Sequence, residues 1–258
     1  MALESSKDEI QLKNRIKDLA DKAFRQNTYT FTGFLGLSEQ DIFWKLDAAK
    51  ELAHIGFSLW GGYEGAERKM VRFGSEEEFG YEEEYPIVCV HVKPLQAKFA
   101  DKLSHRDFLG ALMNLGIERS TIGDIRVAEK EAYLFCVSSI AEYICDTLEK
   151  VKHTNVKCQV VASIADVPVE EPESMEVLLP SLRLDACLAK VYNESRSTIL
   201  DMFRAGKVFV NGRLCENNSK TLKECEVVNL RGYGKFIYDG VKYETKKGNL
   251  SVGIRIYK

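Results

Sequence analysis

The stretch "SRSTILDMFRAGKVFVNGR", Ser195 to Arg213, determines a local fold by its own chemistry. Ser195 stands where a helix N-cap belongs, because its hydroxyl can accept a hydrogen bond from a backbone N–H of the first turn. Gly206 stands where a left-handed residue ends a helix, and Asn211-Gly212 supplies the two positive-φ residues of a tight hairpin. The stretch therefore predicts a short helix followed by a β-hairpin, with basic residues at both ends.

The surrounding segment, residues 182–236, extends this pattern to two helices, a hairpin and a further strand. Its core is predicted from apolar residues at helical or alternating spacing: Leu182, Leu188, Val191, Ile199, Met202, Phe203, Val208 and Val210. The polar positions between them are expected to face outward: Arg183, Ser195, Arg196, Lys207, Asn211, Arg213, Arg231 and Lys235. Such a surface suits the phosphates and shape of folded RNA, so these are the predicted RNA-binding residues. A second hairpin is predicted at Lys247-Gly248-Asn249.

The net charge of −3 hides a division along the chain. Residues 181–258 contain 15 Lys and Arg against 8 Asp and Glu, whereas residues 1–180 contain 21 against 31. A basic region joined to an acidic body favours a polyanionic partner for the C-terminal part, since phosphate neutralisation dominates nucleic-acid affinity. The alternative is that Lys and Arg only solvate a small domain, and charge alone does not choose between the two.

The composition of the 258 residues, with 45% hydrophobic and 29% charged side chains, is that of an ordinary globular protein. The N-terminus mixes charges from its start and no apolar run approaches the length of a membrane-spanning helix, so a cytoplasmic protein without a membrane partner is expected. The seven cysteines and four histidines are scattered singly. This spacing predicts reduced, mostly buried thiols, no metal site and no cofactor.

The distribution of acids, prolines and periodic segments divides the chain into regions. Residues 1–74 are predicted to be mainly helical, and an acidic stretch at 75–86 is expected to be a solvated loop. Residues 86–165 show strand and helix patterns in the order β-α-β-β-α-β, which predicts a ferredoxin-like (RRM-like) domain with both helices on one side of the sheet. Residues 166–180 hold prolines and acids without basic residues, which predicts an extended linker to a C-terminal domain at 181–258. The predicted fold class is α+β.

The central region opens its first helix with "HRDFLGALMN", and H-R-D also begins the catalytic loop of protein kinases. The kinase interpretation fails because Asn114 falls seven residues after Asp107 rather than five, and the sequence has no D-F-G and no Gly-rich phosphate loop. Ser104 and Asp107 instead have the spacing of a capping box. The capping box does not account for His105 and Arg106. These residues either make a second contact with RNA phosphates at the start of the helix or are ordinary solvent-exposed residues of its first turn.

Tyr133 and Phe135 alternate along one face of a predicted strand, where RNA-recognition domains carry base-stacking aromatics. Their flanking residues do not fit the motif of those domains, so packing against the helices of the same domain is the favoured interpretation. Base stacking is the alternative.

Residues 182–236 resemble the S4-type RNA-binding domain, the αL motif of a small-subunit ribosomal protein. The resemblance rests on R-L-D at 183–185, S-R-S at 195–197, G-x-V-x-V-N-G at 206–212 and R-G-Y-G-K-F at 231–236. Spacing, glycines and basic positions agree together over this segment. One departure is Cys225-Glu226, where the domain usually has Gly-Asp; the acid is kept and the turn type is left open.

Over nearly the whole chain, "GGYEGAER" (61–68), "HRDFLGALMNLGIERSTIGDI" (105–125) and the C-terminal segment resemble, in this order, the YlmH family of bacterial RNA-binding proteins. The resemblance implies a non-catalytic protein that binds structured RNA, meaning rRNA and tRNA, and associates with the large ribosomal subunit while tRNA is still attached. Its implied role is the rescue or quality control of stalled translation, without a small-molecule substrate. Relatives have also been linked to cell division.

Two alternatives stay open. Pseudouridine synthases and some methyltransferases carry the same RNA-binding domain, so an RNA-modifying enzyme is possible in principle, although that domain usually precedes a much larger catalytic one. The sequence has no Gly-rich nucleotide loop and no second R-L-D segment that would provide a catalytic aspartate. An enzyme would therefore have to use a cofactor-free site built from His105, Arg106 and Asp107. A scaffold for cell division is the other alternative, and its binding would survive RNase and vary little with salt.

Overall fold

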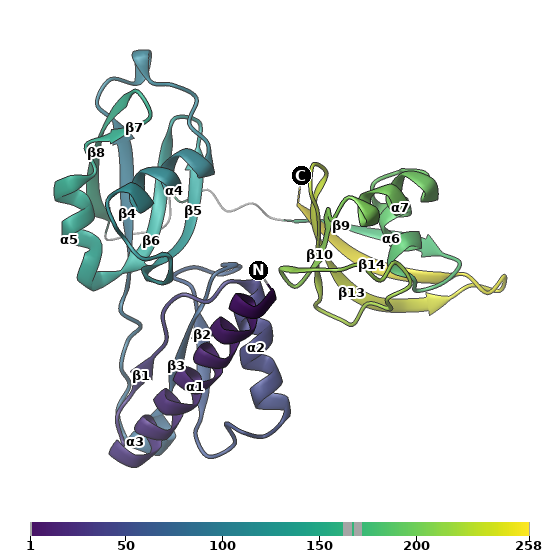
Figure 1. Ribbon diagram of the computed structural model, residues 1–258, viewed down its shortest axis with the longest axis horizontal. Helices are drawn as coiled ribbons and strands as arrows, with labels where there is room; N and C mark the ends of the chain where they lie inside the picture. Colours follow the sequence, from purple (N-terminus) through teal and green to yellow (C-terminus); the bar gives the residue numbers. More distant parts are fainter. Residues whose placement is uncertain (1, 162–166, 168–171, 258) are drawn as a thin grey trace. The chain divides into compact units, whose positions relative to one another are not determined.

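The computed structural model describes residues 2–161, 167 and 172–257 of the chain. It divides into two compact units, Met1–Val169 (unit 1) and Glu170–Lys258 (unit 2), and each is described by itself (Figure 1). Both units combine helices with strands, so the α+β fold class is confirmed.

The first part of unit 1 packs two helices against a small sheet. The helices are α1 (Ala2–Gln26) and α2 (Leu37–Ala48). Three short strands pair antiparallel in the order β1-β3-β2: β1 (Thr30–Phe31), β2 (Phe57–Trp60) and β3 (Met70–Phe73). Phe43 of α2 and Phe73 of β3 are fully buried in the shared core. The prediction that residues 1–74 are mainly helical missed this sheet, because strands of two to four residues leave almost no alternating pattern.

The acidic stretch that follows is not loop throughout. It contains one helical turn, α3 (Glu76–Phe79). Ser75 caps this turn by accepting a hydrogen bond from the Glu78 N–H at 3.3 Å, and Gly80 ends it with a φ of 75°. The cap and the glycine are local signals that the run of glutamates obscures.

The second part of unit 1 has the β-α-β-β-α-β order that the sequence predicts, with one short extra strand. Its elements are β4 (Ile87–Pro94), η1 (Ala97–Phe99), α4 (His105–Asn114), η2 (Arg119–Thr121), β5 (Ile122–Ala128), β6 (Glu131–Val137), α5 (Ser138–Thr147), β7 (Lys150–Val151) and β8 (Thr154–Val161). Neighbouring strands pair antiparallel in the order β5-β6-β4-β8-β7. The predicted capping box is present, with the Ser104 N–H 2.8 Å from Asp107 Oδ2.

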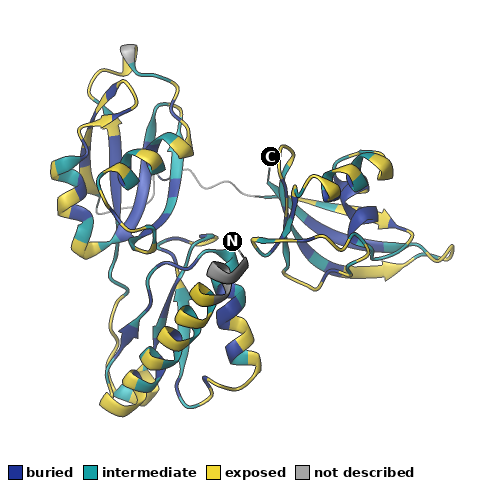
Figure 2. Cartoon of the chain, viewed as in Figure 1, coloured by how far each residue is buried: buried dark blue, intermediate teal, exposed yellow. Residues whose placement is uncertain are grey.

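The two faces of this central sheet are covered in different ways (Figures 1 and 2). Helices α4 and α5 cover one face, where Leu112 and Ile144 are buried against the strands. The opposite face carries Tyr133 and Phe135, which are 6% and 1% exposed. Their predicted burial is confirmed, but the predicted partner is wrong. Phe135 stacks on Tyr63 from the first part of the unit, with ring centroids 4.8 Å apart, because residues 133 and 135 of β6 point away from the helices.

The segment that supplies Tyr63, residues 61–66, is anchored by one carboxylate. Asp124 of β5 accepts a hydrogen bond from the Tyr63 hydroxyl at 2.7 Å. It also accepts the backbone N–H groups of Glu67 at 2.7 Å and Arg68 at 3.0 Å. The segment therefore closes the sheet face from which an RNA-recognition domain would stack bases.

Unit 2 is a six-stranded antiparallel sheet with two helices, in the strand order β11-β10-β12-β13-β14-β9. Its elements are β9 (Glu173–Leu179), α6 (Leu184–Val191), α7 (Arg196–Arg204), β10 (Val208–Val210), β11 (Arg213–Leu214), β12 (Val227–Leu230), β13 (Gly234–Glu244) and β14 (Leu250–Tyr257). The predicted helix and hairpin are confirmed by α7 and by the β10–β11 turn, where Asn211 and Gly212 have φ angles of 49° and 73°. The second predicted hairpin is the β13–β14 connection.

The predicted linker at 166–180 is wrong over its second half. Strand β9 occupies Glu173–Leu179 and pairs with β14 along its whole length. Val177 and Leu179 enter the core, while Glu173 near the strand's start and Glu176 on the other face are both exposed, which an edge strand tolerates. Residues 166 and 168–171 lie outside the described residues.

Candidate nucleic-acid interface

The predicted RNA-binding residues of unit 2 lie on turns and at the ends of elements. They are Arg183 before α6, Ser195 before α7, Arg196 at the start of α7, Lys207 between α7 and β10, Asn211 and Arg213 at the β10–β11 turn, Arg231 in the β12–β13 turn and Lys235 near the start of β13.

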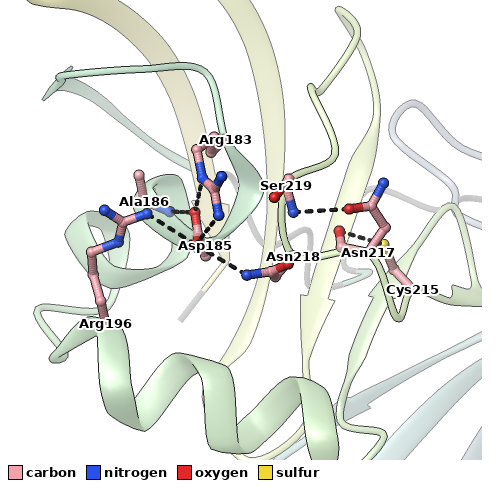
Figure 3. A network of polar contacts seen from close by, with 8 residues as sticks. All are labelled: Arg183, Asp185, Ala186, Arg196, Cys215, Asn217, Asn218 and Ser219. Carbon is pink, nitrogen blue, oxygen red and sulfur yellow. Dashed lines mark hydrogen bonds and ion pairs between the residues drawn. The ribbon is translucent and has the colours of Figure 1, made fainter.

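Two of the arginines are held by a buried carboxylate (Figure 3). Asp185, with a side chain 2% exposed, lies in the first turn of α6. Arg183 donates from Nε to Oδ1 at 3.1 Å and from Nη2 to Oδ2 at 2.8 Å, and Arg196 donates from Nη2 to Oδ2 at 3.0 Å. The Asn218 amide at 3.3 Å and the Ala186 N–H at 2.8 Å complete the shell.

The charges of this cluster support one another. Burial alone would raise the pKa of Asp185, but the hydrogen bonds from Arg183 and Arg196 outweigh burial and lower the pKa. The hydrogen bond to Asp185 in turn raises the pKa of Arg183. Asp185 and Arg183 are therefore both charged at neutral pH, and the carboxylate has the counter-charges that burial demands.

The expectation that Arg183 and Arg196 simply face outward needs correction, because each uses part of its guanidinium on Asp185. Their side chains are nevertheless 41% and 55% exposed. A guanidinium has five N–H donors, so donors remain on the solvent side of both residues. The two arginines form a pair of fixed spacing rather than two independent side chains.

Sequence reasoning noted Asp185 only as part of the R-L-D motif, not as the anchor of the arginines, and it missed Asn218. The signal for Asp185 is a single acid inside a helical turn whose other side chains, such as Leu184 and Ala186, are apolar. Asn218 carries no comparable signal. It is brought in by the segment after β11, where its carbonyl also accepts the Asp185 N–H at 3.0 Å.

Ser195 and Asn211 have structural partners. Ser195 Oγ accepts the Thr198 N–H at 3.0 Å as the N-cap of α7, and Asn211 Oδ1 accepts the Val227 N–H at 2.9 Å. Each oxygen satisfies a backbone donor that would otherwise be unpaired, while Ser195 remains exposed and Asn211 half-buried. Contact of these two residues with RNA stays a prediction. Arg213 opens β11 and is half-buried.

A second group of basic residues lies where β10, β12 and β13 come together. The Arg231 N–H donates to the Lys207 carbonyl at 3.0 Å, so these two residues are neighbours, and both are exposed. The Arg231 guanidinium lies 4.5 Å from the centre of the Phe209 ring, and the Lys235 amine lies 4.7 Å from that of Tyr257. These contacts orient the positive charges without neutralising them.

The β12–β13 turn also contacts the turn between α6 and α7. The Tyr233 hydroxyl donates to Glu194 at 2.9 Å, and the rings of Tyr233 and Tyr192 are 5.5 Å apart. The turns of unit 2 thus support one another. We call their basic residues the turn surface: Arg183, Arg196, Lys207, Arg231 and Lys235.

His105 and Arg106 open α4 in unit 1, and the structure does not bring them into one site. Burial and the neighbouring Arg119 lower the pKa of His105, so its imidazole is largely neutral at pH 7. Arg106 is exposed and lines a hollow between α4 and the β7–β8 turn. Consecutive helical residues diverge by about 100°, which explains the separation.

In the described part of the chain, no helix has the length and apolar character needed to cross a membrane, and no three His, Cys, Asp or Glu side chains are grouped to hold a metal ion. The seven cysteines are free thiols, and their predicted burial holds for most of them. Burial raises the pKa of Cys136 and Cys158 to about 12, so these thiols are unreactive at neutral pH.

Basic side chains gathered on neighbouring turns of an α+β unit are typical of an RNA-binding protein. A family model described as "Putative RNA-binding domain in YlmH" matches residues 81–164. The "Ribosome-associated protein quality control protein P2" of Bacillus subtilis (strain 168) is 30% identical over 220 residues, which are 84% of this chain and 82% of that protein. The chain belongs to the YlmH family. The solved structure described as "Cell division protein ylmH from Streptococcus pneumoniae" covers 62% of this chain and 95% of its own, with 17% identity and a TM-score of 0.49.

Proposed function

We propose that this chain is a non-catalytic cytoplasmic protein that binds structured RNA through an S4-type domain, unit 2. It associates with the large ribosomal subunit carrying tRNA and acts in the rescue or quality control of stalled translation. The observation that carries the proposal is the arginine pair on Asp185, which presents positive charge from a fixed position at the start of α6 and α7.

Fixed arginines suit folded RNA better than mobile ones. A lysine or arginine that must be ordered on binding loses side-chain entropy, whereas Arg183 and Arg196 are already ordered by Asp185. Lys207 and Arg231 add exposed charge on the neighbouring turn. Contacts from several turns read the backbone and shape of RNA rather than base sequence.

The ribosomal part of the proposal is supported by the Bacillus subtilis relative, whose name describes a ribosome-associated quality control protein. The non-catalytic part is supported by the use of Asp185. Its oxygens bond to side chains and an N–H of unit 2 itself, so this carboxylate is a structural anchor rather than a general base.

The test is sedimentation of the purified chain with small subunits, large subunits and whole ribosomes over a series of salt concentrations. Lys207→Ala/Arg231→Ala is the informative variant, because neither side chain contacts Asp185. Removing two phosphate contacts should lower the log–log salt slope by about 1.4 to 1.8. The wild type should pellet with large subunits.

The matched control is Arg15→Ala/Lys22→Ala, which removes the same charges from exposed positions of α1 in unit 1 and should leave binding unchanged. No pelleting of the wild type with any particle would overturn the ribosomal proposal and favour an enzyme acting on free RNA or a division scaffold. Pelleting that resists both salt and the double substitution would reject the turn surface.

A further inference from the structure

The part of unit 1 that matches the family's RNA-binding model cannot use its sheet to stack bases. Phe135, at the position where such a base would stack, is 1% exposed beneath Tyr63. Asp124 holds that cover through three hydrogen bonds. If this part of unit 1 touches RNA, another surface must do so.

The other prominent surface feature of this part is a hollow of about 550 Å³ between α4, the end of α5 and the β7–β8 turn. Its lining includes Arg106, Gly110, Asn114, Lys150 and Lys152. Arg106, Lys150 and Lys152 are all exposed. The walls thus carry three cations and an amide, which come from α4, β7 and the β7–β8 turn.

Polar contacts within the domain hold one wall of the hollow in place. The Lys152 amine lies 3.0 Å from Asp107, which bonds in turn to the Ser104 N–H at 2.8 Å. Hydrogen bonds from Ser104, followed by that from Lys152, lower the pKa of Asp107 to about 2. The capping box of α4 therefore fixes Lys152 at the wall, and Glu149 is the one other acid among the lining residues.

Gly110 gives an independent indication of a ligand. It lies exposed in the middle of α4, where glycine is a poor residue, and a Cβ at this position would meet nothing within 4 Å. Packing within the unit therefore does not require a glycine here. A bare stretch of helix on the wall of a hollow permits close approach of another molecule.

The charge around the hollow identifies the chemistry of that molecule. The lining itself holds three cations, Arg106, Lys150 and Lys152, against two acids, Asp107 and Glu149. The adjoining segments are also basic within an acidic N-terminal body: residues 93–107 hold four Lys and Arg against two acids, and residues 150–157 hold three Lys and no acid. The two segments lie side by side, since the Leu95 N–H donates to the Asn155 carbonyl at 2.9 Å and the Asp101 N–H to Thr154 Oγ1 at 3.0 Å. A local excess of cations favours a polyanion.

We propose that this hollow binds the phosphate backbone of structured RNA, with Arg106, Lys150 and Lys152 on the phosphates and the backbone lying against Gly110. The site rests on the proposed function and gives the chain an RNA contact in unit 1 as well as in unit 2. Asn114 can donate to a sugar or phosphate oxygen.

The test compares three double variants of the full chain for binding to purified large ribosomal subunits across a salt series. Arg106→Ala/Lys150→Ala should lower affinity on the order of tenfold and reduce the log–log salt slope by about 1.4 to 1.8. Arg15→Ala/Lys22→Ala, again one Arg and one Lys, should match the wild type. Lys207→Ala/Arg231→Ala reports on unit 2 separately.

A photo-crosslinking amino acid in place of Asn114 identifies what occupies the hollow, and ribosomal RNA should be the crosslinked species. Unchanged affinity of Arg106→Ala/Lys150→Ala overturns the site while leaving unit 2 intact, and crosslinks to protein alone overturn it in favour of an acidic protein partner. Failure of the wild type to bind any particle is instead a failure of the proposed function. Gly110→Ala should raise helix stability and still weaken binding; stronger binding would contradict the proposal.

Discussion

Two aspartates anchor the two units in opposite ways. Asp124 in unit 1 accepts two backbone N–H groups and a tyrosine hydroxyl, and so fastens a segment of chain over a sheet. Asp185 in unit 2 accepts mainly from arginine side chains, whose outer donors stay in contact with solvent. The same functional group closes a surface in one unit and organises an open one in the other.

The two aspartates differ in the groups that donate hydrogen bonds to them. A backbone donor fixes the path of the chain, so its loss changes the fold, whereas an arginine donor fixes a charge on a fold that other residues specify. Residues around Asp124 should therefore control stability, and those around Asp185 should control stability and RNA affinity together. The following substitutions separate these effects.

Gly62→Ala should have the largest effect. Gly62 has a φ of 98°, and a Cβ there would lie 2.4 Å from the Phe135 ring. Left-handed strain of about 1 to 2 kcal/mol and overpacking of about 1 to 3 kcal/mol should together lower the free energy of unfolding of unit 1 by about 2 to 5 kcal/mol. Urea denaturation followed by tryptophan fluorescence measures this, since Trp44 and Trp60 both lie in unit 1.

Gly80→Ala is the matched control, because Gly80 has a φ of 75° with nothing within 4 Å of a Cβ. It should cost only the strain, about 1 to 2 kcal/mol. Equal losses in the two variants would show that the cover over Phe135 is loose.

Asp185→Ala should have the next largest effect. Removing the carboxylate leaves Arg183 and Arg196 able to reach water, so the expected loss for unit 2 is about 2 to 3 kcal/mol. Hydrogen–deuterium exchange of unit 2 peptides measures it, since unit 2 has no tryptophan. RNA affinity should fall as well, although a negative charge has been removed. Tighter RNA binding would contradict the positioning role.

The pH dependence of this loss provides a control within the same experiment. The pKa of Asp185 is lower in the folded chain than its ordinary value, so the ionised carboxylate stabilises unit 2 above about pH 4. That contribution is lost as pH falls through the folded pKa. The difference between wild type and Asp185→Ala should be constant from pH 7 to about pH 5 and shrink below about pH 4. A difference that persists in acid would point to lost packing instead.

Cys225→Gly should have the smallest effect, and it should be stabilising. Cys225 has a φ of 64°, the left-handed conformation that glycine adopts without strain. The substitution should add up to about 1 kcal/mol to the free energy of unfolding of unit 2. Thermal unfolding of unit 2 measures the gain. Cys225→Ala keeps the Cβ and should show no gain; equal behaviour of the two variants would exclude backbone strain.

The sequence predicts those parts of the fold whose signals are local. Ser195, Gly206 and Asn211-Gly212 each specify a backbone conformation, and the structure has all of them. The structure also explains the departure at Cys225-Glu226: the cysteine takes the glycine conformation, and Glu226 accepts the Lys223 N–H at 2.9 Å.

The sequence does not predict features that depend on distant partners. The acids of strand β9 and the prolines beside it locally resemble a linker. Its strand conformation depends on pairing with β14, which lies about 75 residues further on. The position of Phe135 toward Tyr63 and the shell of Asp185 also depend on segments far along the chain. Lys207 and Arg231 were predicted singly, and only strand pairing makes them neighbours.

The pairing of β9 with β14 brings the two ends of unit 2 together. These strands are the first and last of unit 2, and Glu173 lies opposite Ile256, so the two ends of the unit meet at one corner of the sheet. A domain whose ends meet can be inserted into another protein, excised from it or circularly permuted without breaking its internal pairing. The strand pairing of unit 2 therefore permits the unit to be transferred between proteins as one intact domain.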